Sequence, residues 1–542
     1  LGEPVAIACT SSTATCNYLP PITEAYYQQV PLLVLTGDRD PMLLDQLEDQ
    51  MINQVDMYKN FCRKCVTLPV VTTDKDIWYC QRLVNEAILA LNHHGAGPVQ
   101  INFPINQSIE DIADASVPEL PMYNVIRRVD PQSPAEAWRP YIDRLRQARR
   151  ILVVCGSGTP LTASAQDAMS SFADKYDCLF ATEHLSNVHC RNSLNTFLLA
   201  EAYSDKFLGV ANPDLVIYFG GNFVSRLKVQ LRGRKDNYES WLITPEGRVM
   251  DPFQDQTMIF DCTPEYFFRY CADQAGNRSS DRVYYNEVKS RIEKLKLPDL
   301  GALALPQGIC TPAKDAHLSN VYAFYQLSRV IPKNSLVHLS ILNSTRVMSM
   351  FELDPSVTVY SNIGTDGIDG SMSTFFGQMA ATQRTGYLVI GDLSFFYDMN
   401  SVGIRNLSKN IHILLVNNGG GAEFYFSMGR KRLPNIDCHI SAQHSHKARE
   451  WVTANGFHYM QAQTRAEVDS QMKAFAQSEG PVLMEVFTHR ESDAESIKAL
   501  RRAIHVTTAG EAVKQTGKAL LEKAPVSVEM EGQLKRVFKK LF

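Results

Sequence analysis

Short apolar runs that end in polar residues recur along the chain, a pattern typical of buried strands in a parallel sheet. The clearest two are 388–390, which ends at Gly391-Asp392, and 411–416, which ends at Asn417-Asn418. Between them, residues 399–408 carry apolar side chains at helical spacing. This order predicts a strand, a crossover helix and a second strand, and therefore a parallel sheet.

The polar ends of these two strands carry groups that can bind a metal. Ligands of parallel sheets bind at the carboxyl ends of the strands, where Asp392, Asn418 and the run Gly419-Gly420-Gly421 are expected. A carboxylate, an amide oxygen and a free carbonyl suit Mg²⁺, which also takes oxygens from the phosphates of a ligand. From the residues alone, this is either a metal–phosphate site or an ordinary polar strand end of an α/β protein.

Strand and helix signals alternate over most of the 542 residues and predict an α/β protein of several domains. Apolar runs at 5–9, 31–36 and 98–103 predict one sheet, and runs from 150 and at 214–223 predict another. We expect a first domain over 1–106, a linker over 107–145, a central domain over 146–275, a linker and leading helix over 276–325, a third domain over 326–490 and a helical tail over 491–542.

Composition narrows the class of protein without naming its chemistry. A net charge of −4 and 45% hydrophobic residues are ordinary for a globular protein and predict no nucleic-acid surface. No apolar run is long enough to span a membrane. The twelve cysteines are scattered, and Cys62 and Cys65 form a CxxC pair without a second pair, so we expect reduced thiols and a cytoplasmic location. A basic amphipathic helix at 534–541 either packs on its own protein or lies on a membrane.

The stretch GDLSFFYDMN followed by NNGGG, with Asp392 and Asn418 26 positions apart, resembles the signature of the thiamine diphosphate-dependent enzymes. It is most similar to the menaquinone-pathway synthases that join 2-oxoglutarate to isochorismate (SEPHCHC synthases). The segments ACTSSTATCNYLPP, LTGDRDP and GPVQINFPI resemble the pyrimidine-binding domain of the same family. The resemblance implies three doubly wound parallel-sheet domains of the thiamine diphosphate decarboxylase type, the first of them truncated at its N-terminus.

The resemblance also implies the cofactors, thiamine diphosphate and Mg²⁺, and the residues that hold them. Asp392, Asn418 and the Gly420 carbonyl would bind the metal, and backbone amides around Leu393-Ser394 and in the loop 419–423 would meet the diphosphate. The cofactor-binding set is Gly391, Asp392, Leu393, Ser394, Asn418, Gly420, Gly421 and Ile368, the last matching the residue that bends the cofactor. In the family, the activating Glu lies upstream of the first strand, at a point that Leu1 already falls past. Either the chain is a fragment or this acid is absent, and residues 1–542 alone are expected to turn over nothing.

Substrate-binding positions carry over less completely. The matched residues are Arg39, Gln50, Arg226, Ser344, Arg346 and Phe424, and the resemblance counts Arg39 and Gln50 among the catalytic residues with Ile368. Three positions where the family has arginine are apolar here, Leu227, Met348 and Ile363, and Glu423 replaces an aliphatic residue. Because carboxylates need cationic partners, we expect an acceptor with less charge than isochorismate, such as an aldehyde or a keto sugar.

Three functions follow as hypotheses. The first is a thiamine diphosphate- and Mg²⁺-dependent 2-oxo acid decarboxylase and carboligase whose carbonyl or enone acceptor is not isochorismate. The second is the menaquinone-pathway synthase reaction itself, and the third is a catalytically silent protein that kept the fold. In all three, the resemblance implies a homodimer or homotetramer, because the family's cofactor site forms between two subunits.

Overall fold

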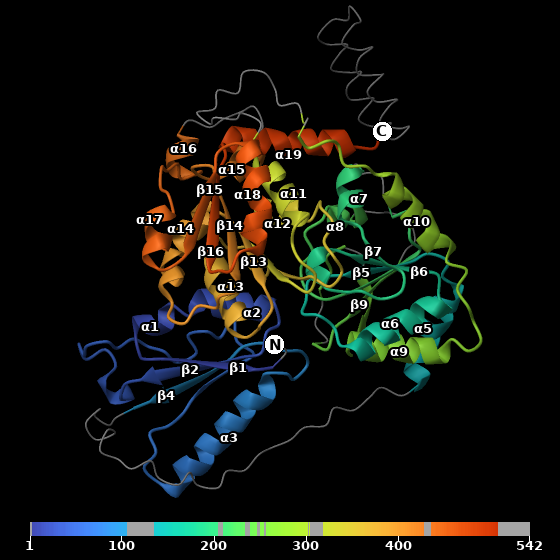
Figure 1. The fold of residues 1–542 in the computed structure, drawn as a ribbon. Coiled ribbons are helices and arrows are strands. Elements are labelled where there is room, and N and C mark those ends of the chain that lie inside the picture. The colour runs from blue at the N-terminus through green and yellow to red at the C-terminus, as the bar shows by residue number, and fades with distance from the viewer. Residues whose placement is uncertain are drawn as a thin grey trace, which may run out of the picture.

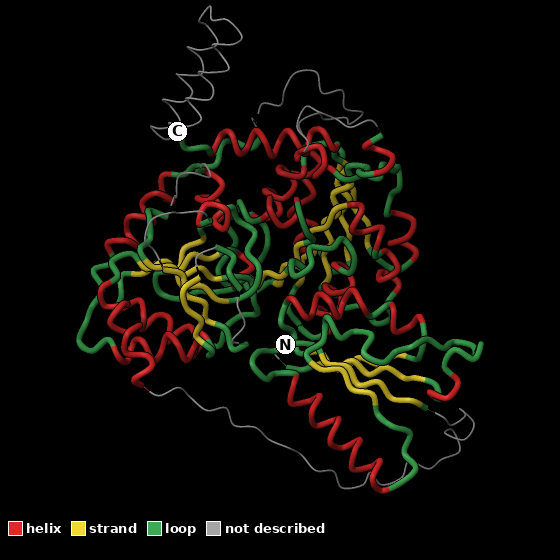
Figure 2. Tube along the Cα trace, turned by 180° about the vertical axis from the view of Figure 1, so that it is seen from behind, coloured by secondary structure: helices red, strands yellow, loops and turns green. Residues whose placement is uncertain are grey.

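Three parallel β-sheets organise the chain (Figure 1). The computed structural model describes residues 3–105, 135–203, 210–232, 239–246, 250–253, 256–301, 303, 318–427 and 435–507. Helices flank the sheets on both sides, as the view from behind also shows (Figure 2). The predicted α/β class with three parallel-sheet units is confirmed, whereas the exact domain limits remain a prediction.

The first sheet is formed near the N-terminus and has the strand order β1-β2-β4-β3. Its elements are β1 (Val5–Cys9), α1 (Thr13–Cys16), α2 (Leu19–Tyr27), β2 (Leu32–Asp38), β3 (Lys64–Thr67), α3 (Asp74–Ala90) and β4 (Val99–Pro104). The expected strands at 5–9, 31–36 and 98–103 therefore form, each within two residues of the prediction. In Figure 1 this sheet lies beneath the third one, with α2 at the contact between them.

The central sheet has the order β10-β9-β8-β5-β6-β7, with every paired strand parallel. Its elements are α5 (Ala135–Gln147), β5 (Ile151–Cys155), α6 (Ala163–Lys175), β6 (Cys178–Thr182), β7 (Ser193–Asn195), α7 (Phe197–Ala202), β8 (Leu215–Phe219), α8 (Leu227–Leu231), β9 (Glu239–Ile243), β10 (Gln256–Phe260), α9 (Pro264–Gln274) and α10 (Val283–Lys294). The Gly156-Ser157-Gly158 turn follows β5 directly.

The third sheet has the order β12-β11-β13-β14-β16-β15. It contains the apolar runs 388–390 and 411–416, which form β13 and β14. Its strands are β11 (Leu336–Leu339), β12 (Thr358–Tyr360), β13 (Gly386–Gly391), β14 (Ile411–Asn417), β15 (His458–Ala462) and β16 (Val482–Phe487). Its helices are α11 (Asn320–Ser328), α12 (Asn343–Met348), α13 (Ser371–Ala380), α14 (Asp392–Tyr397), α15 (Ala422–Ser427), α16 (Ile436–His439), α17 (Arg449–Ala454), α18 (Arg465–Gln477) and α19 (Arg490–Ile504).

Both faces of the third sheet are buried, which explains why its strands read as continuous apolar runs. On β13, Tyr387 and Val389 pack into one core cluster, whereas Leu388 and Ile390 pack into another on the opposite face. This alternation follows from the two-residue period of a strand. The sheet therefore provides a rigid base for whatever lies at its carboxyl edge.

The expected crossover helix at 399–408 is wrong in position. Helix α14 begins at Asp392, directly after β13, and a 3-10 helix follows over Met399–Gly403, with no helix over 404–410. Asn406 adopts a left-handed backbone with φ of 61°, a conformation that does not continue an α-helix. Because α14 begins directly after β13, Asp392 lies in the first turn of a helix and not in a loop.

The segment after 490 is helical only in part of the range that the structure describes. Helix α19 packs its apolar face, including Ile497 and Leu500, into the core of the third sheet. The basic helix expected at 534–541 lies outside the described residues. Within the described part of the chain, no helix is long and apolar enough to cross a membrane, and the cysteines are free thiols.

Candidate cofactor and substrate site

Pairing of β13 with β14 brings Asp392 and Asn418 together, as their spacing predicted. Gly391 lies opposite Val416, so both strands end at the same edge. The Oδ2 atom of Asp392 accepts backbone N–H groups from Asn418 (3.1 Å), Gly419 (2.7 Å) and Gly420 (3.0 Å). Its Oδ1 atom accepts the Leu393 N–H at 2.7 Å. We call Asp392, Asn418 and Gly420 the oxygen cradle.

The side-chain amide of Asn418 has one paired and one unpaired end. Its Nδ2 donates to Asp493 Oδ2 at 2.7 Å. Its Oδ1 is buried and has no hydrogen-bond partner among the described residues. Since a buried polar atom is ordinarily paired, this oxygen fits the ligand of a metal ion.

Asp493 is completely enclosed and belongs to α19. Its Oδ1 accepts the Asn320 N–H and its Oδ2 accepts Thr488 Oγ1, both at 2.8 Å. Burial raises the pKa of this carboxyl to about 7, against the lowering effect of its hydrogen bonds, and the charge of Asp392 adds to the rise. Asp493 therefore ties the cradle to two further elements of the third domain.

Two stacked histidines, His444 and His446, lie beside the cradle. His444 Nε2 is 3.2 Å from Asp392 Oδ2, and His444 Nδ1 accepts the backbone N–H of His446 at 3.1 Å. Because Nδ1 is the acceptor, a neutral His444 carries its proton on Nε2, the nitrogen that faces the carboxylate. His444 also donates its backbone N–H to the Gly419 carbonyl, so it holds the loop as well as the acid.

The glycine loop has a conformation that side chains would prevent. Gly420 has a φ of 145°, and a Cβ there would lie 2.6 Å from the Ser441 carbonyl oxygen. The Gly420 carbonyl accepts the Ala422 N–H at 3.1 Å and keeps a second lone pair for a metal. Several amides expected to meet the diphosphate are already paired, however: Gly419 and Gly420 donate to Asp392, and Gly421 donates to Ser441.

Ile368 lies near the cradle and is joined to it through its backbone. Ser394 Oγ donates to the Ile368 carbonyl at 2.6 Å and accepts a hydrogen bond from Ser340 Oγ at 2.9 Å. Ile368 is 38% exposed, and a few other large apolar residues of this domain are also exposed. An exposed isoleucine fixed beside the cradle fits the expected support for a bound cofactor.

The donor set of the cradle fits Mg²⁺. Asp392 Oδ1, Asn418 Oδ1 and the Gly420 carbonyl are all hard oxygen donors, the type that Mg²⁺ prefers in combination with phosphate oxygens and water. The crowded Oδ2 of Asp392 serves the loop and His444, which leaves Oδ1 for the ion. Among the described residues, no cluster of three or more His, Cys, Asp or Glu side chains offers a competing metal site.

The predicted substrate residues Arg226 and Arg346 belong to a charged cluster between the central and third domains. Arg346 Nη1 contacts Glu423 Oε1 at 2.7 Å, and Arg501 Nε contacts Glu201 Oε2 at 2.8 Å. Burial lowers the pKa of Arg501, and the nearby charges of Arg226 and Arg346 lower it further. We call these five residues the arginine cluster; it combines three cations with two carboxylates.

The positions where the family has arginine contribute packing instead of charge. Met348 and Ile363 lie in the main core of the third domain, and Leu227 lies in a core cluster of the central domain. Ser344 is buried in α12, and Phe424 lies beside the glycine loop, close to Gly421. The sequence missed Arg501, which supplies a cation from a different position.

Arg39 and Gln50 lie in the first domain, and no described contact joins them to the cradle. Ser11 Oγ donates to the Gln50 carbonyl at 3.0 Å, at the carboxyl edge of the first sheet. The first domain reaches the third through α2, where the Glu24 carboxylate accepts the backbone N–H of Thr365 at 2.8 Å. Within one chain, therefore, no hydrogen bond or ion pair of the described residues links these two predicted residues to the cradle.

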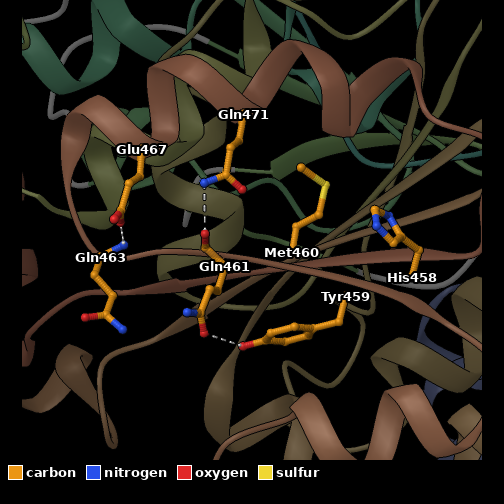
Figure 3. A pocket seen from close by; sticks show the side chains of 7 residues that line it. All are labelled: His458, Tyr459, Met460, Gln461, Gln463, Glu467 and Gln471. Carbon is orange, nitrogen blue, oxygen red and sulfur yellow. Dashed lines mark hydrogen bonds between the residues drawn. The ribbon is translucent and has the colours of Figure 1, made fainter.

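A separate hollow of about 480 Å³ lies along the edge strand β15 and contributes nothing to the cradle (Figure 3). Its lining residues are His458, Tyr459, Met460, Gln461, Gln463, Glu467 and Gln471. Figure 3 shows Gln471 and Glu467 of α18 bonded to the strand segment below them. Gln471 and Glu467 are engaged in these bonds, and the hollow shares no lining residue with the cradle.

Four residues around the site escaped sequence reasoning, for two different reasons. Asp493 and Arg501 stand on a helix far along the chain from Asn418 and Arg346, and their local sequence carries no signal. His444 and His446, in contrast, follow the glycine loop as a visible pair, and such a pair after a metal-binding loop could have been singled out.

Comparison with known proteins adds a family to this geometry. No family model matches the chain. It is 34% identical over 517 residues to 2-succinyl-5-enolpyruvyl-6-hydroxy-3-cyclohexene-1-carboxylate synthase of Bacteroides fragilis, covering 92% of this chain and 87% of the relative. The same-named proteins of Bacteroides thetaiotaomicron and Porphyromonas gingivalis are 32% and 28% identical, each over 506 residues, 92% of this chain and 86% of the relative.

Proposed function

The chain belongs to the 2-succinyl-5-enolpyruvyl-6-hydroxy-3-cyclohexene-1-carboxylate synthase family, and from this premise we propose that it is a thiamine diphosphate- and Mg²⁺-dependent carboligase. It decarboxylates a 2-oxo acid and forms a carbon–carbon bond between the remaining unit and a carbonyl or enone acceptor. The observation that carries this proposal is the buried, unpartnered Asn418 Oδ1 beside Asp392. A catalytically silent protein has no need to keep such an atom.

The chain's own residues would bind and orient, because thiamine diphosphate supplies the electron sink for decarboxylation when bound. Asp392, Asn418 and the Gly420 carbonyl would hold Mg²⁺, and Ile368 would support the cofactor from the side. Arg346 and Arg501 would orient a substrate carboxylate, since guanidinium groups bind carboxylates in a fixed geometry. The apolar residues that bury both faces of the third sheet keep water from the base of this site.

The acceptor is where two candidates differ. The apolar residues Leu227, Met348 and Ile363 favour an acceptor with less charge than isochorismate, such as an aldehyde or a keto sugar. The second candidate is the reaction that the relatives' name describes. Arg501 favours it, because this arginine places a third cation beside Arg226 and Arg346 and offsets part of the loss.

The experiment uses the full-length protein and measures binding before turnover. Calorimetric titration with thiamine diphosphate and Mg²⁺ together is expected to show saturable binding, and its absence would leave the catalytically silent alternative. The loaded protein is then incubated with 2-oxoglutarate or pyruvate, in parallel with isochorismate and with a simple aldehyde, and products are followed by mass. A succinyl-cyclohexene adduct supports the relatives' reaction, and an aldehyde adduct supports the less charged acceptor.

The proposed assembly is a homodimer or homotetramer. Its support is that no hydrogen bond or ion pair of the described residues links Arg39 or Gln50 to the cradle within one chain, so a site that uses both would draw on the first domain of a second copy. Sedimentation velocity of the full-length protein is expected to show no monomer at micromolar concentration. A stable monomer with full activity would contradict this part of the proposal.

A further inference from the structure

The two consecutive asparagines at the end of β14 are anchored by different buried acids. Asn417 Nδ2 donates to Glu485 Oε1 at 2.7 Å and to the His446 carbonyl at 2.8 Å. Asn418 Nδ2 donates to Asp493 Oδ2 at 2.7 Å. Glu485 comes from the neighbouring strand β16, whereas Asp493 comes from α19, which the sequence gives no reason to associate with the cradle.

The carboxylate of Asp493 determines which way the Asn418 amide faces. In the structure, the carboxylate of Asp493 accepts hydrogen bonds from two sides. On one side its Oδ1 takes the Asn320 N–H, and on the other its Oδ2 takes Thr488 Oγ1 and Asn418 Nδ2. A reversed amide would place Asn418 Oδ1 against Oδ2, two acceptors in contact. Only the observed orientation therefore leaves Oδ1 directed away from Asp493.

We propose that Asp493 is the positioning residue that fixes the Asn418 amide with its oxygen toward the metal. This inference rests on the proposed function, because it gives the free oxygen an ion to bind. Residues that orient metal ligands from behind typically change metal affinity 10- to 100-fold when they are replaced. Asp493 contacts the Nδ2 side of the Asn418 amide and acts through Asn418.

The isosteric change Asp493→Asn makes this role measurable. An amide has one accepting and one donating side, so it cannot accept from Asn320 and from Asn418 at the same time. If its oxygen faces Asn320, its NH₂ group faces Asn418 and selects the reversed amide, which turns a donor toward the metal. We expect the Kd for Mg²⁺, at saturating thiamine diphosphate, to rise by about 10- to 100-fold.

A swapped pair provides the rescue that a merely structural role would not produce. In Asn418→Asp combined with Asp493→Asn, the new amide donates to the new carboxylate and still accepts from Asn320. That carboxylate presents an oxygen to the metal in either orientation. The double variant is therefore expected to bind Mg²⁺ at least tenfold more tightly than Asp493→Asn alone, whereas Asn418→Asp alone places two acids side by side and binds poorly.

The measurements are isothermal titration with Mg²⁺ and calorimetric unfolding of the ligand-free proteins. Glu495→Gln is the matched control, because it makes the same acid-to-amide change on α19. Glu495 is only partly buried and forms an ion pair with Lys498. The Kd of this variant should match that of the wild type. If the wild type binds no cofactor with Mg²⁺, the proposed function fails.

If the wild type binds, two results would overturn the inference: an Asp493→Asn variant within twofold of the wild type, or a swapped pair no tighter than the single variant. If Asp493→Asn fails to fold, the test compares the Mg²⁺ Kd of the swapped pair with that of the wild type. Recovery to within tenfold supports the positioning role, and loss of Mg²⁺ binding by a folded swapped pair contradicts it.

Discussion

The oxygen cradle and the arginine cluster differ in how their charges are held. In the cradle, three backbone N–H groups and the side chain of His444 surround one oxygen of Asp392, and a buried acid fixes Asn418. In the arginine cluster, long side chains from several helices neutralise each other in pairs. The cradle is thus preorganised around a free ligand atom, whereas the cluster must exchange an internal partner for a substrate.

This difference bears on function because preorganised groups lose little freedom when they bind. Metal binding at the cradle is expected to depend on single atoms and to respond sharply to substitution. Substrate binding at the cluster is expected to respond by smaller factors, since Arg346 already has a carboxylate neighbour in Glu423. Four substitutions test the contrast.

The largest expected effect is that of Asp392→Ala. This change removes a metal ligand and takes away the carboxylate to which four backbone N–H groups donate. At a ligand concentration of 100 times its Kd, the wild type should gain about 2.7 kcal/mol of stability from the cofactor with Mg²⁺, and the variant should gain none. Thermal unfolding with and without ligands measures both, and Asp143→Asn, at an exposed ion pair on α5, is the control. If the cofactor with Mg²⁺ stabilises Asp392→Ala as much as it stabilises Asp143→Asn, the metal binds elsewhere.

Sequence reasoning predicted the cradle and missed most of its surroundings for a physical reason. Asp392 and Asn418 lie on one βαβ unit, whose strand ends meet by the rules of parallel sheets, so their proximity follows from local pattern. Asp493 reaches Asn418 only because α19 packs against the third sheet, and Arg501 reaches Arg346 in the same way. Such contacts depend on tertiary packing that apolar periodicity does not specify. The misplaced helix at 399–408 shows the same limit, because apolar spacing alone did not reveal the left-handed Asn406.

The next effect concerns the shape of the cradle. Gly420→Ala puts a Cβ 2.6 Å from the Ser441 oxygen at a φ of 145°, so we expect a loss of about 1–3 kcal/mol in stability and weaker Mg²⁺ binding as the loop shifts. Gly377→Ala is the matched control, since its Cβ meets nothing within 4 Å in helix α13 and alanine favours a helix. Chemical unfolding and Mg²⁺ titration distinguish the two variants. If Gly420→Ala leaves the Kd for Mg²⁺ unchanged, the cradle is not preorganised.

A smaller effect is expected in the arginine cluster. Glu423→Gln removes the carboxylate 2.7 Å from Arg346 and releases that cation for a substrate. We expect the KM for the 2-oxo acid to fall by up to about tenfold, equivalent to about 1.4 kcal/mol, with Mg²⁺ affinity unchanged. Steady-state kinetics of the full-length protein provide the measurement, and Glu287→Gln, near the surface on α10, is the control. A rise in KM would show instead that Glu423 holds Arg346 in its working position.

The last effect is a pH dependence that arises in the core of the third sheet, outside both regions. His338 lies on β11 of the third sheet, fully buried, with Nδ1 3.0 Å from Gln378 Oε1, and burial lowers its pKa to about 4. The unfolded chain takes up this proton below about pH 6.5 and the folded chain only near pH 4, so stability must fall as the pH falls between these values. His338→Asn should reduce that slope by up to about 1.4 kcal/mol per pH unit. His184 and His412, whose pKa values are also lowered by desolvation, retain their share of the slope. Urea unfolding at pH 7.5 and pH 5 measures the difference, and a variant with the wild-type slope would show that His338 is protonated in the fold.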